Sequence, residues 1–509
     1  MMKKYNKLMV LVCCFWVFSC ATTDEHPYGI YTKENFLTNE SNTRLSLLFA
    51  HDATQSYDFF RQLYFVTEIG TGTSGLSANF FAGEAPDFKN WTFNPLTPGL
   101  RDFFAGEYIA IRRANEVIAI DESIEFDNPA AKLALIGEAR FLRALHYFYL
   151  VRTFGEVPLY LGGESPEDYS KTPVSSIEDI YSSIIEDLQF AMANVGEFKI
   201  MGRADSTAAE ALLSKVYLHL ASSKEYGSPM YEWVSDANTM YTNAANAARN
   251  VMNSSIYALE TDTFGNFPDH EKTSSENIYI WAVDLASNTI GRTGLHTLFQ
   301  PYEWYVPFYT DAPGKPAWID DPVNGEVVEY EAGWAGIWWH NDKFQTLDAN
   351  DERRDLYLVN TYDDINGNAH SAINPLVHFP YKYSTDGTAF YTGAAKFNFL
   401  RLSDIALTLA EAVGPTAEGY DMMNQIRTRA GIGNLNPALS ETDFRDAVWQ
   451  EREWELAMEY HTLFDLRRTH RVDEYIGMDA NYSYFHPLPQ REVDLNTEIE
   501  NDDYKIDLN

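Results

Sequence analysis

The stretch "EARFLRALHYFYLVRTFGEVPLYL" (residues 138–161) decides the class of fold. As far as residue 154 its apolar side chains recur at the three- and four-residue spacing of a helix, and Gly155 then acts as a stop signal. A helix with so broad an apolar face is stable only when other elements cover that face. The stretch therefore predicts a long helix packed within a mostly α-helical fold.

The same helical periodicity returns in several other segments. Ser175 with Glu178, and Thr207 with Glu210, have the spacing of a capping box at the start of two of them. The expected helices cover residues 175–195, 206–222, 398–414, 420–431 and 441–464. Short helices paired through tight turns are typical of tetratricopeptide-like hairpins, although no clean repeat of that period is visible.

Residues 262–395 have a different composition, rich in glycine, proline, aspartate, asparagine and aromatic residues. The segment "NIYIWAV" (residues 277–283) predicts a short strand, and most of the remainder predicts long ordered loops, which are usually functional. The expected divisions are residues 1–19, 20–261, 262–395 and 396–509. In this scheme the second and fourth form a helical scaffold, the third is a loop-rich, aromatic-rich insertion, and the three pack as one unit.

The N-terminus predicts export and lipidation. Lysines at its start precede the apolar run "LMVLVCCFWVF" (residues 8–18), which is shorter than a membrane span and is typical of a signal peptide. Cleavage before Cys20 would leave that residue as the one cysteine of the mature chain, which favours a lipidated cysteine over a disulfide or a metal ligand. An ordinary secretory signal with a chance cysteine is the alternative. We expect a protein that a lipid anchor tethers to a membrane and that does not cross it.

Composition and motifs exclude several classes of function. The formal net charge of -36 repels phosphate, so we expect no nucleic-acid partner. "GTGTSG" (residues 70–75) fits a dinucleotide-binding pattern only formally, because no helix follows it, and a mobile loop is the better interpretation. "DINGN" (residues 364–368) lacks the later residues of a calcium loop, and the histidines show no zinc spacing. We therefore predict neither a metal nor a cofactor.

Several segments, in order along the chain, resemble the SusD/RagB family of outer-membrane lipoproteins of Bacteroidetes. Those segments are residues 138–161, "GRADSTAAEALLSKVYLHLA" (202–221), "SSENIYI" (274–280), "KFNFLRLSDIALTLAEAV" (396–413), "MNQIRTRAGI" (423–432), "EREWELAMEYHTLFDLRR" (451–468) and "FHPLPQREVDLN" (485–496). One departure is "YHTLF" (residues 460–464), because the family usually has Gly-x-Arg at this point. The conformation of that turn therefore stays open.

The resemblance implies tetratricopeptide-like helix pairs with a loop-rich face. It implies a non-catalytic, outward-facing lipoprotein of the cell outer membrane that binds a nutrient oligosaccharide. The implied partner is a SusC-like TonB-dependent transporter, to which the ligand is delivered. A peptide-binding protein of the same architecture is one alternative, and an α-helical glycoside hydrolase or lyase is another.

The insertion contains the candidate ligand-binding residues. Indole rings offer flat faces for the C–H surface of a sugar, and nearby acidic and amide groups can accept from its hydroxyls. The candidates are Trp304, Tyr305, Trp318, Trp334 and Trp338. Core packing is the alternative for any one of them. If residues 334–338 form a helical turn, Trp334 and Trp338 share one face, and Trp339 points inward as a structural anchor.

The C-terminal segment "EREWELAMEY" (residues 451–460), with Arg467 and Arg468 after it, could suggest acid–base chemistry. Its acids recur at helical spacing, and arginines nearby can pair with them. We therefore predict structural ion pairs in the C-terminal helices.

Overall fold

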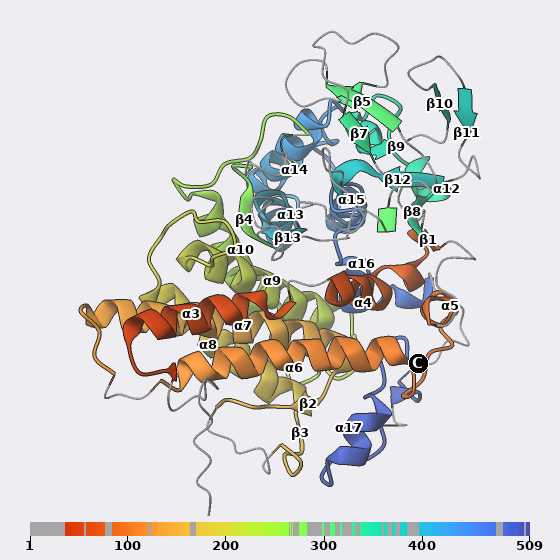
Figure 1. Cartoon of the computed structure of the whole chain (residues 1–509). Helices are drawn as coiled ribbons and strands as arrows, with labels where there is room; N and C mark the ends of the chain where they lie inside the picture. The colour runs from red at the N-terminus through yellow and green to blue at the C-terminus, as the bar shows by residue number, and fades with distance from the viewer. Residues whose placement is uncertain are drawn as a thin grey trace, which may run out of the picture.

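The computed structural model describes residues 36–54, 57–76, 84–120, 124–162, 169–263, 265, 267, 274–281, 298–299, 306–310, 316–317, 328–330, 336–358, 361–363, 369–371, 377–383, 397–474, 482–502 and 505–508. Two parts are visible in Figure 1, where helices occupy the lower and central region and most short strands gather at the upper right. The prediction of a mostly helical scaffold with a distinct insertion is confirmed.

Helices form most of the described structure. They are α3 (Glu40–His51), α4 (Tyr57–Thr67), α5 (Ala85–Asn90), α6 (Pro98–Ile118), α7 (Pro129–Phe154), α8 (Ile177–Asn194), α9 (Ser206–Glu225), α10 (Ala237–Met252), α12 (Asn341–Phe344), α13 (Leu402–Val413), α14 (Ala417–Arg429), α15 (Glu441–Glu455), α16 (Thr462–Arg468) and α17 (Gln490–Leu495). Each of α6 to α9 packs on its successor, and α10 packs on α13 across the insertion. None of the helices that the structure describes has the length and apolar character needed to cross a bilayer.

Helix α7 is the long helix that residues 138–161 predicted. Asn128 caps it by accepting from the backbone N–H of Ala130, and Pro129 occupies the first turn, where its missing N–H costs nothing. From Gly137 onward nearly every side chain is buried, because α6 and α8 cover two sides of the helix. Gly155 ends the helix at φ 74°, a conformation that favours glycine.

Two of the predicted caps were wrong by one or two positions. Ser176, not Ser175, caps α8 by accepting from the N–H of Asp179, and Asp205, not Thr207, caps α9 by accepting from Ala208. Ser175 and Ser176 are equally good capping residues, and Thr207 and Asp205 are both favourable ones, so residue type alone did not show which of each pair caps the helix. The backbone enters the helix one residue later at α8 and two residues earlier at α9.

The insertion contains more strand than the sequence predicted. The strands are β1 (Ser74–Leu76), β2 (Val157–Pro158), β3 (Val174–Ser175), β4 (Asn277–Trp281), β5 (Val306–Thr310), β6 (Pro316–Ala317), β7 (Val328–Tyr330), β8 (Ile337–His340), β9 (Tyr357–Leu358), β10 (Thr361–Asp363), β11 (Ala369–Ser371), β12 (Val377–Pro380) and β13 (Phe397–Arg401). Strands β5 to β12 replace the expected long loops, whereas β4 confirms the strand predicted at residues 277–283. They have two to five residues each, too few for an alternating pattern to appear in the sequence.

The strands form small antiparallel sheets. One sheet has the order β1-β8-β12-β9, another β6-β5-β7, and three pairs complete the set: β4 with β13, β10 with β11, and β2 with β3. The residues of "DINGN" join β10 to β11 and lie outside the described residues. Strand β1 comes from the N-terminal region, so the four-stranded sheet joins that region to the insertion.

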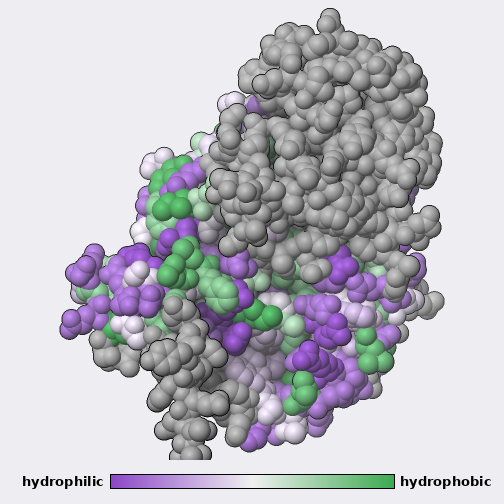
Figure 2. Space-filling model, in the orientation of Figure 1, coloured by the Kyte–Doolittle hydropathy of each residue, from purple (hydrophilic) through white to green (hydrophobic). Residues whose placement is uncertain are grey.

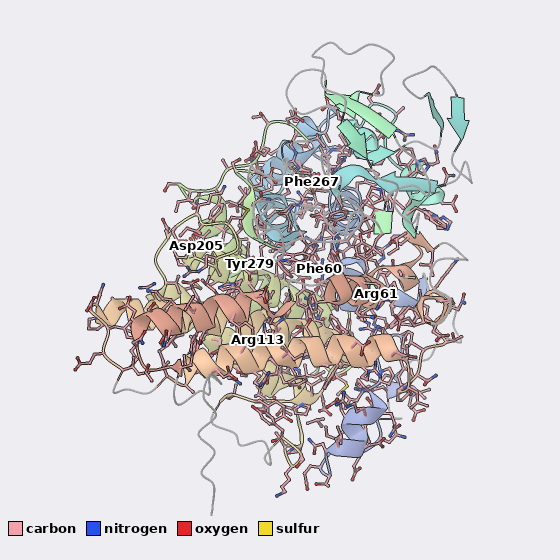
Figure 3. The ribbon with its side chains drawn as sticks, viewed as in Figure 1. Phe60, Arg61, Arg113, Asp205, Phe267 and Tyr279 are labelled. Carbon is pink, nitrogen blue, oxygen red and sulfur yellow. The ribbon has the colours of Figure 1, made fainter. Side chains whose placement is uncertain are left out.

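An aromatic cluster lies where these parts meet. Phe60 of α4 stacks on Trp281 of β4 at 4.2 Å between ring centroids, and the ring of Tyr460 meets Phe397 of β13 at the same distance. Figure 3 shows Phe60 and Tyr279 near the centre of the molecule. Helix, insertion strand and C-terminal turn therefore share one hydrophobic core.

The turn whose conformation the sequence left open holds two non-glycine residues in the left-handed region. Met458 has φ 67° and Tyr460 has φ 65°. Such a conformation costs of order 1 kcal/mol for a residue with a Cβ atom. Both side chains are buried, and the Met458 carbonyl accepts from the hydroxyl of Tyr383 at 2.6 Å. Core packing therefore holds a turn that glycine would form without strain.

The surface seen in Figure 2 is mostly hydrophilic where it is coloured, with apolar residues gathered over α3. Leu45, Leu48 and Phe49 of that helix are each about half exposed. The guanidinium of Arg113 lies 3.5 Å from the centre of the Phe49 ring and covers one of its faces.

Candidate functional site

Of the candidate binding residues, the structure describes Trp338. Trp304, Tyr305, Trp318 and Trp334 lie outside the described residues, as does the candidate lipidation residue Cys20, so their assignments stay predictions. Trp338 lies on β8, in the middle of the four-stranded sheet, between β1 and β12.

The condition of a helical turn is not met at Trp338, because residues 337–340 form a strand. Side chains of a strand alternate between two faces, and β8 follows this rule: Ile337 and Trp339 are buried, Trp338 is partly exposed and His340 is exposed. Trp338 and Trp339 therefore point to opposite faces of the sheet. Of the two, only Trp338 keeps part of its side chain exposed.

Trp338 is positioned by a glycine on the neighbouring strand. Gly75 of β1 is its cross-strand partner, and a Cβ atom added at Gly75 would lie 1.9 Å from the indole Nε1 of Trp338. The ring therefore occupies the space that a side chain at position 75 would take. Such aromatic–glycine pairs are a known way to fix an aromatic ring on a sheet.

The segment "GTGTSG" is therefore not the mobile loop that the sequence suggested. Thr71, Thr73 and Ser74 are buried, and the Thr71 and Thr73 hydroxyls share a hydrogen bond of 2.7 Å. The carbonyl of Thr73 accepts from the N–H of His340 at 2.7 Å. The segment gains its order from β8, a partner far away in sequence, which a local reading of the sequence does not reveal.

Trp339 is a structural anchor, as predicted. Its side chain is fully buried, and its ring meets Phe344 of α12 edge-on at 6.2 Å between centroids. Phe344 in turn stacks at 3.7 Å on His378 of β12. These contacts tie β8, α12 and β12 together beneath the partly exposed face of the sheet.

Ion pairs fasten this part of the insertion to the C-terminal helices. Arg353 is buried and contacts Glu451 of α15 at 2.7 Å and Glu455 at 3.3 Å. Lys382, also buried, contacts Glu459 at 2.7 Å, just beyond the end of α15. Two cations of the insertion thus meet a row of carboxylates spaced four residues apart.

Cations of the scaffold meet the same row. Arg401 of β13 contacts Glu455 and Glu459 at 2.7 Å each, and Arg429 of α14 contacts Glu455 at 2.6 Å. Burial alone would raise the pKa of Glu455, but the charges of the surrounding arginines hold that pKa well below its usual value. The predicted ion pairs of the C-terminal helices are confirmed as structural. Arg467 differs, because its guanidinium donates to backbone carbonyls instead.

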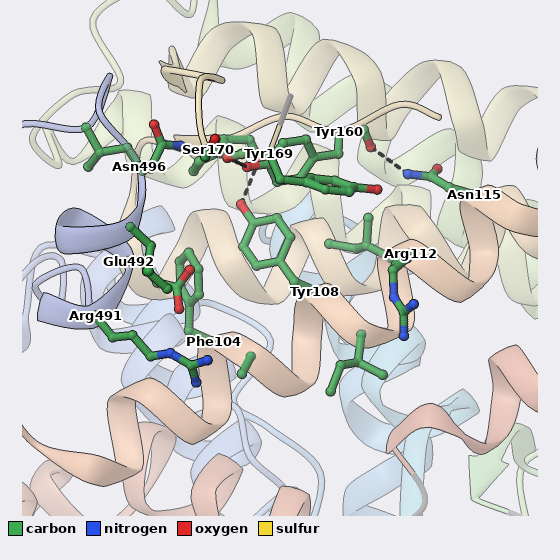
Figure 4. A pocket seen from close by; sticks show the side chains of 16 residues that line it. Phe104, Tyr108, Arg112, Asn115, Tyr160, Tyr169, Ser170, Arg491, Glu492 and Asn496 are labelled. Carbon is green, nitrogen blue, oxygen red and sulfur yellow. Dashed lines mark hydrogen bonds between the residues drawn. The ribbon is translucent and has the colours of Figure 1, made fainter. Parts of the chain in front are cut away.

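A second feature, which the sequence did not predict, is a pocket of about 490 Å³ between α6, α17 and the segment around β2. Aromatic rings of Phe104, Tyr108, Tyr160 and Tyr169 line it, and Figure 4 shows Arg491 and Glu492 of α17 at one side of it. Its lining comes from three separate segments, so no single motif could reveal it. In Figure 1, α17 lies at the opposite end of the molecule from β8 and β12.

The polar groups of this pocket mostly serve the fold. The hydroxyl of Tyr108 donates to the carbonyl of Pro158 at 2.6 Å, and that of Tyr160 donates to the carbonyl of Tyr169 at 3.0 Å. Asn115 donates to the carbonyl of Tyr160 at 3.0 Å. The tyrosine hydroxyls and the Asn115 amide are thus turned toward the backbone, while Arg491 and Glu492 supply charged groups at one side of the pocket. Among the described residues, no group of three histidine, cysteine or acidic side chains is arranged to hold a metal ion.

Two family models match separate parts of the chain. The model described as the SusD family matches residues 323–482, and one described as "Starch-binding associating with outer membrane" matches residues 81–218. A relative called SusD-like protein P2, from Formosa agariphila, is 25% identical over 98% of this chain and 99% of its own length.

Solved structures match the fold. A laminarin-binding SusD-like protein superposes with a TM-score of 0.72 at 22% identity, covering 91% of this chain and 99% of that one. A crystal structure with xylogluco-oligosaccharide superposes with a TM-score of 0.70 at 20% identity, covering 89% of this chain and 97% of that one. Because the two SusD-type models together match more than half of the chain, and a SusD-like relative matches it over nearly its full length, this chain belongs to the SusD family.

Proposed function

We propose that this protein is a non-catalytic surface lipoprotein that binds an oligosaccharide at the insertion and delivers it to a SusC-like transporter. The observation that supports the proposal most directly is Trp338, a partly exposed indole fixed over Gly75 with a buried partner, Trp339, beneath the sheet. An aromatic ring held in place before binding loses little entropy when a ligand stacks on it.

The chemistry of the insertion suits a neutral sugar. An indole offers a flat apolar face and a polar N–H, and a sugar offers C–H faces and hydroxyls. Trp304, Tyr305, Trp318 and Trp334 would extend the platform that Trp338 begins. Two relatives of similar fold support the ligand class, since one is described as laminarin-binding and the other as solved with a xylogluco-oligosaccharide.

Location and partner are part of the same proposal. Lipidation of Cys20 would tether the protein to the outer membrane, facing outward, and one matching family model is described as associating with that membrane. Delivery to a SusC-like TonB-dependent transporter is what the resemblance to the family implies. Co-purification of the full-length protein with such a barrel after mild detergent extraction would support this part, and its absence from the extracted complex would contradict it.

The ligand class can be tested by titration calorimetry of residues 20–509 at two ionic strengths. Binding of a neutral oligosaccharide should change less than about twofold between 50 mM and 500 mM salt, because no net charge is brought together. A cationic peptide attracted by the negative charge of the chain would bind much more weakly at the higher salt. Salt-sensitive binding of a peptide, with no binding across an oligosaccharide panel, would establish the peptide alternative. Release of new reducing ends by catalytic amounts of protein would establish the enzyme alternative.

Replacing Gly75 by valine tests how Trp338 is positioned. The new side chain would occupy the place of the indole, so we expect oligosaccharide affinity to fall about tenfold or more while the helical circular dichroism stays unchanged. Gly433→Val is the matched control, since Gly433 has no atom near the place of its missing Cβ and no positive φ. Equal affinity of the two variants would remove Trp338 from the binding surface.

A further inference from the structure

A small, partly open cavity lies among the helices of the scaffold, and its lining shares no residue with the pocket of Figure 4. Its volume is about 20 Å³, and side chains of α7, α9, α13, α15 and α16 line it. The polar groups that line it include Arg152, Lys215, His219, Thr408, Arg452, His461, Asp465 and Arg468. A space of this size holds one water molecule or one small ion.

Arg152 lines this cavity and is unusual in being a buried cation without a direct ion pair in the part of the chain that the structure describes. Its side chain is 8% exposed, and its guanidinium lies between two phenyl rings, 3.6 Å from the centre of the Phe148 ring and 3.8 Å from that of Phe464. The Nε donates to the carbonyl of Phe148 at 2.8 Å. Among the described residues, neither an acceptor for Nη1 and Nη2 nor a carboxylate partner for Arg152 is found.

A second donor without a partner lines the same cavity. The hydroxyl of Thr408, on α13, is fully buried and has no hydrogen-bond partner among the described residues. Stacking between the two rings leaves the planar edge of the Arg152 guanidinium free to point into the cavity. Donors of two helices, α7 and α13, therefore converge on one small space.

Arg467 shows how this protein otherwise treats a buried arginine that has no carboxylate partner. Its Nε donates to the carbonyl of Ser483, its Nη1 to the carbonyl of Arg152 and its Nη2 to the ring of His486. Every nitrogen of that guanidinium has an acceptor. In Arg152, by contrast, Nε is the one nitrogen of the guanidinium with an acceptor among the described residues.

The carboxylates nearest the cavity are already paired with other cations. Lys215 and Arg452 pair with Asp404, while Arg452 and Arg468 pair with Asp465, and Arg468 also pairs with Glu411. These three carboxylates pair directly with Lys215, Arg452 and Arg468, whereas Arg152 has no direct ion pair within the described structure and interacts only at longer range with Asp465 and Glu107. Burial and the Arg152 charge hold the pKa of His219 well below its ordinary value, so His219 adds no charge near neutral pH. A buried charge with no counter-charge is costly.

We propose that this cavity binds one small monovalent anion of halide size, held by the Arg152 guanidinium and the Thr408 hydroxyl. Such an anion supplies the missing acceptor for both donors and places a counter-charge in direct contact with Arg152. A water molecule would satisfy the donors but not the charge. The volume of about 20 Å³ suits an ion of halide size. The anion is structural, because its neighbours tie α7 to α13, α15 and α16.

Halide-dependent stability tests the proposal. At constant ionic strength, replacing sodium gluconate by sodium chloride should raise the melting temperature of the mature protein by ~2 °C, because an anion that binds only the folded state stabilises it. Crystals soaked in sodium bromide should show an anomalous peak between Arg152 and Thr408. A melting temperature that does not depend on the halide, together with no anomalous peak there, would overturn the proposal in favour of water.

Variants separate this site from a general salt effect. Arg152→Met keeps an unbranched apolar chain between the two rings and should abolish the halide dependence. Thr408→Val has nearly the same shape and should reduce that dependence even if Arg152→Met does not fold. Arg44→Met is the control, because Arg44 is exposed and pairs with Glu40 on α3. An equal halide response in Thr408→Val and Arg44→Met would place the ion elsewhere.

Discussion

Replacing Trp304, Trp334 and Trp338 together by alanine is expected to lower oligosaccharide affinity by at least about a hundredfold. Aromatic residues at the centre of a binding surface typically contribute 2 kcal/mol or more each, and about 1.4 kcal/mol corresponds to a tenfold change in affinity. Losses in one cluster are not additive, so the total should fall short of the sum. Titration calorimetry with the oligosaccharide that binds best to the unmodified protein measures the effect.

Trp233→Ala is the matched control for this variant. Trp233 is a partly buried tryptophan of the helical scaffold, near Tyr181 of α8 and distant in sequence from the insertion. Its replacement should leave oligosaccharide affinity within about twofold of that of the unmodified protein. If the triple variant also keeps full affinity, the binding surface is not the insertion. The tyrosine-lined pocket of α6 and α17 then becomes the site to test, through Tyr169→Ala.

The second large effect is expected on stability, from Glu455→Gln. Glu455 is 3% exposed and contacts Arg401, Arg429 and Arg353, so neutralising it leaves buried arginines with too few carboxylates. Breaking a buried ion pair by removing one partner typically costs about 3–5 kcal/mol. The glutamine keeps the shape of the side chain, so the loss reports on charge and not on a cavity. Urea unfolding followed by tryptophan fluorescence measures the change in the free energy of unfolding.

Glu418→Gln provides the comparison for Glu455→Gln. Glu418 pairs with Arg249 at 2.7 Å, but 36% and 39% of the two side chains are exposed. An exposed pair contributes at most about 1 kcal/mol, so this variant should unfold close to the unmodified protein. Similar small losses in both variants would show that the carboxylate row beside α15 is dispensable.

Patterns within one element were predictable from the sequence. The spacing of apolar residues around Phe141 and Leu145 predicted α7, and the acids beginning at Glu451 predicted ion pairs on α15. Exact caps were less predictable, because Ser175 and Ser176 are chemically equivalent neighbours. The periodicity is a property of many residues, whereas a cap depends on where the backbone turns.

Features made by distant segments were not predictable. Gly75 and Trp338 are separated by most of the chain, so the sequence could not reveal that one leaves room for the other. The assumption of a helical turn gave the wrong geometry for Trp338 but the right inward direction for Trp339. The proposed anion site at Arg152 combines hydrogen-bond donors of α7 and α13 with charged side chains of α9, α15 and α16. Long-range pairing of this kind appears only once the topology is known.

The carboxylate row beside α15 has a consequence for how ligand preference can change among such proteins. Arg353 and Lys382 fix two points of the insertion to a helix that does not itself belong to the proposed binding surface. Residues between and around those two points can then be exchanged without loosening the attachment. An insertion from another member of the family should therefore pack on this scaffold if it keeps a basic residue at the positions of Arg353 and Lys382. The chimaera should then have the ligand selectivity of the donor protein.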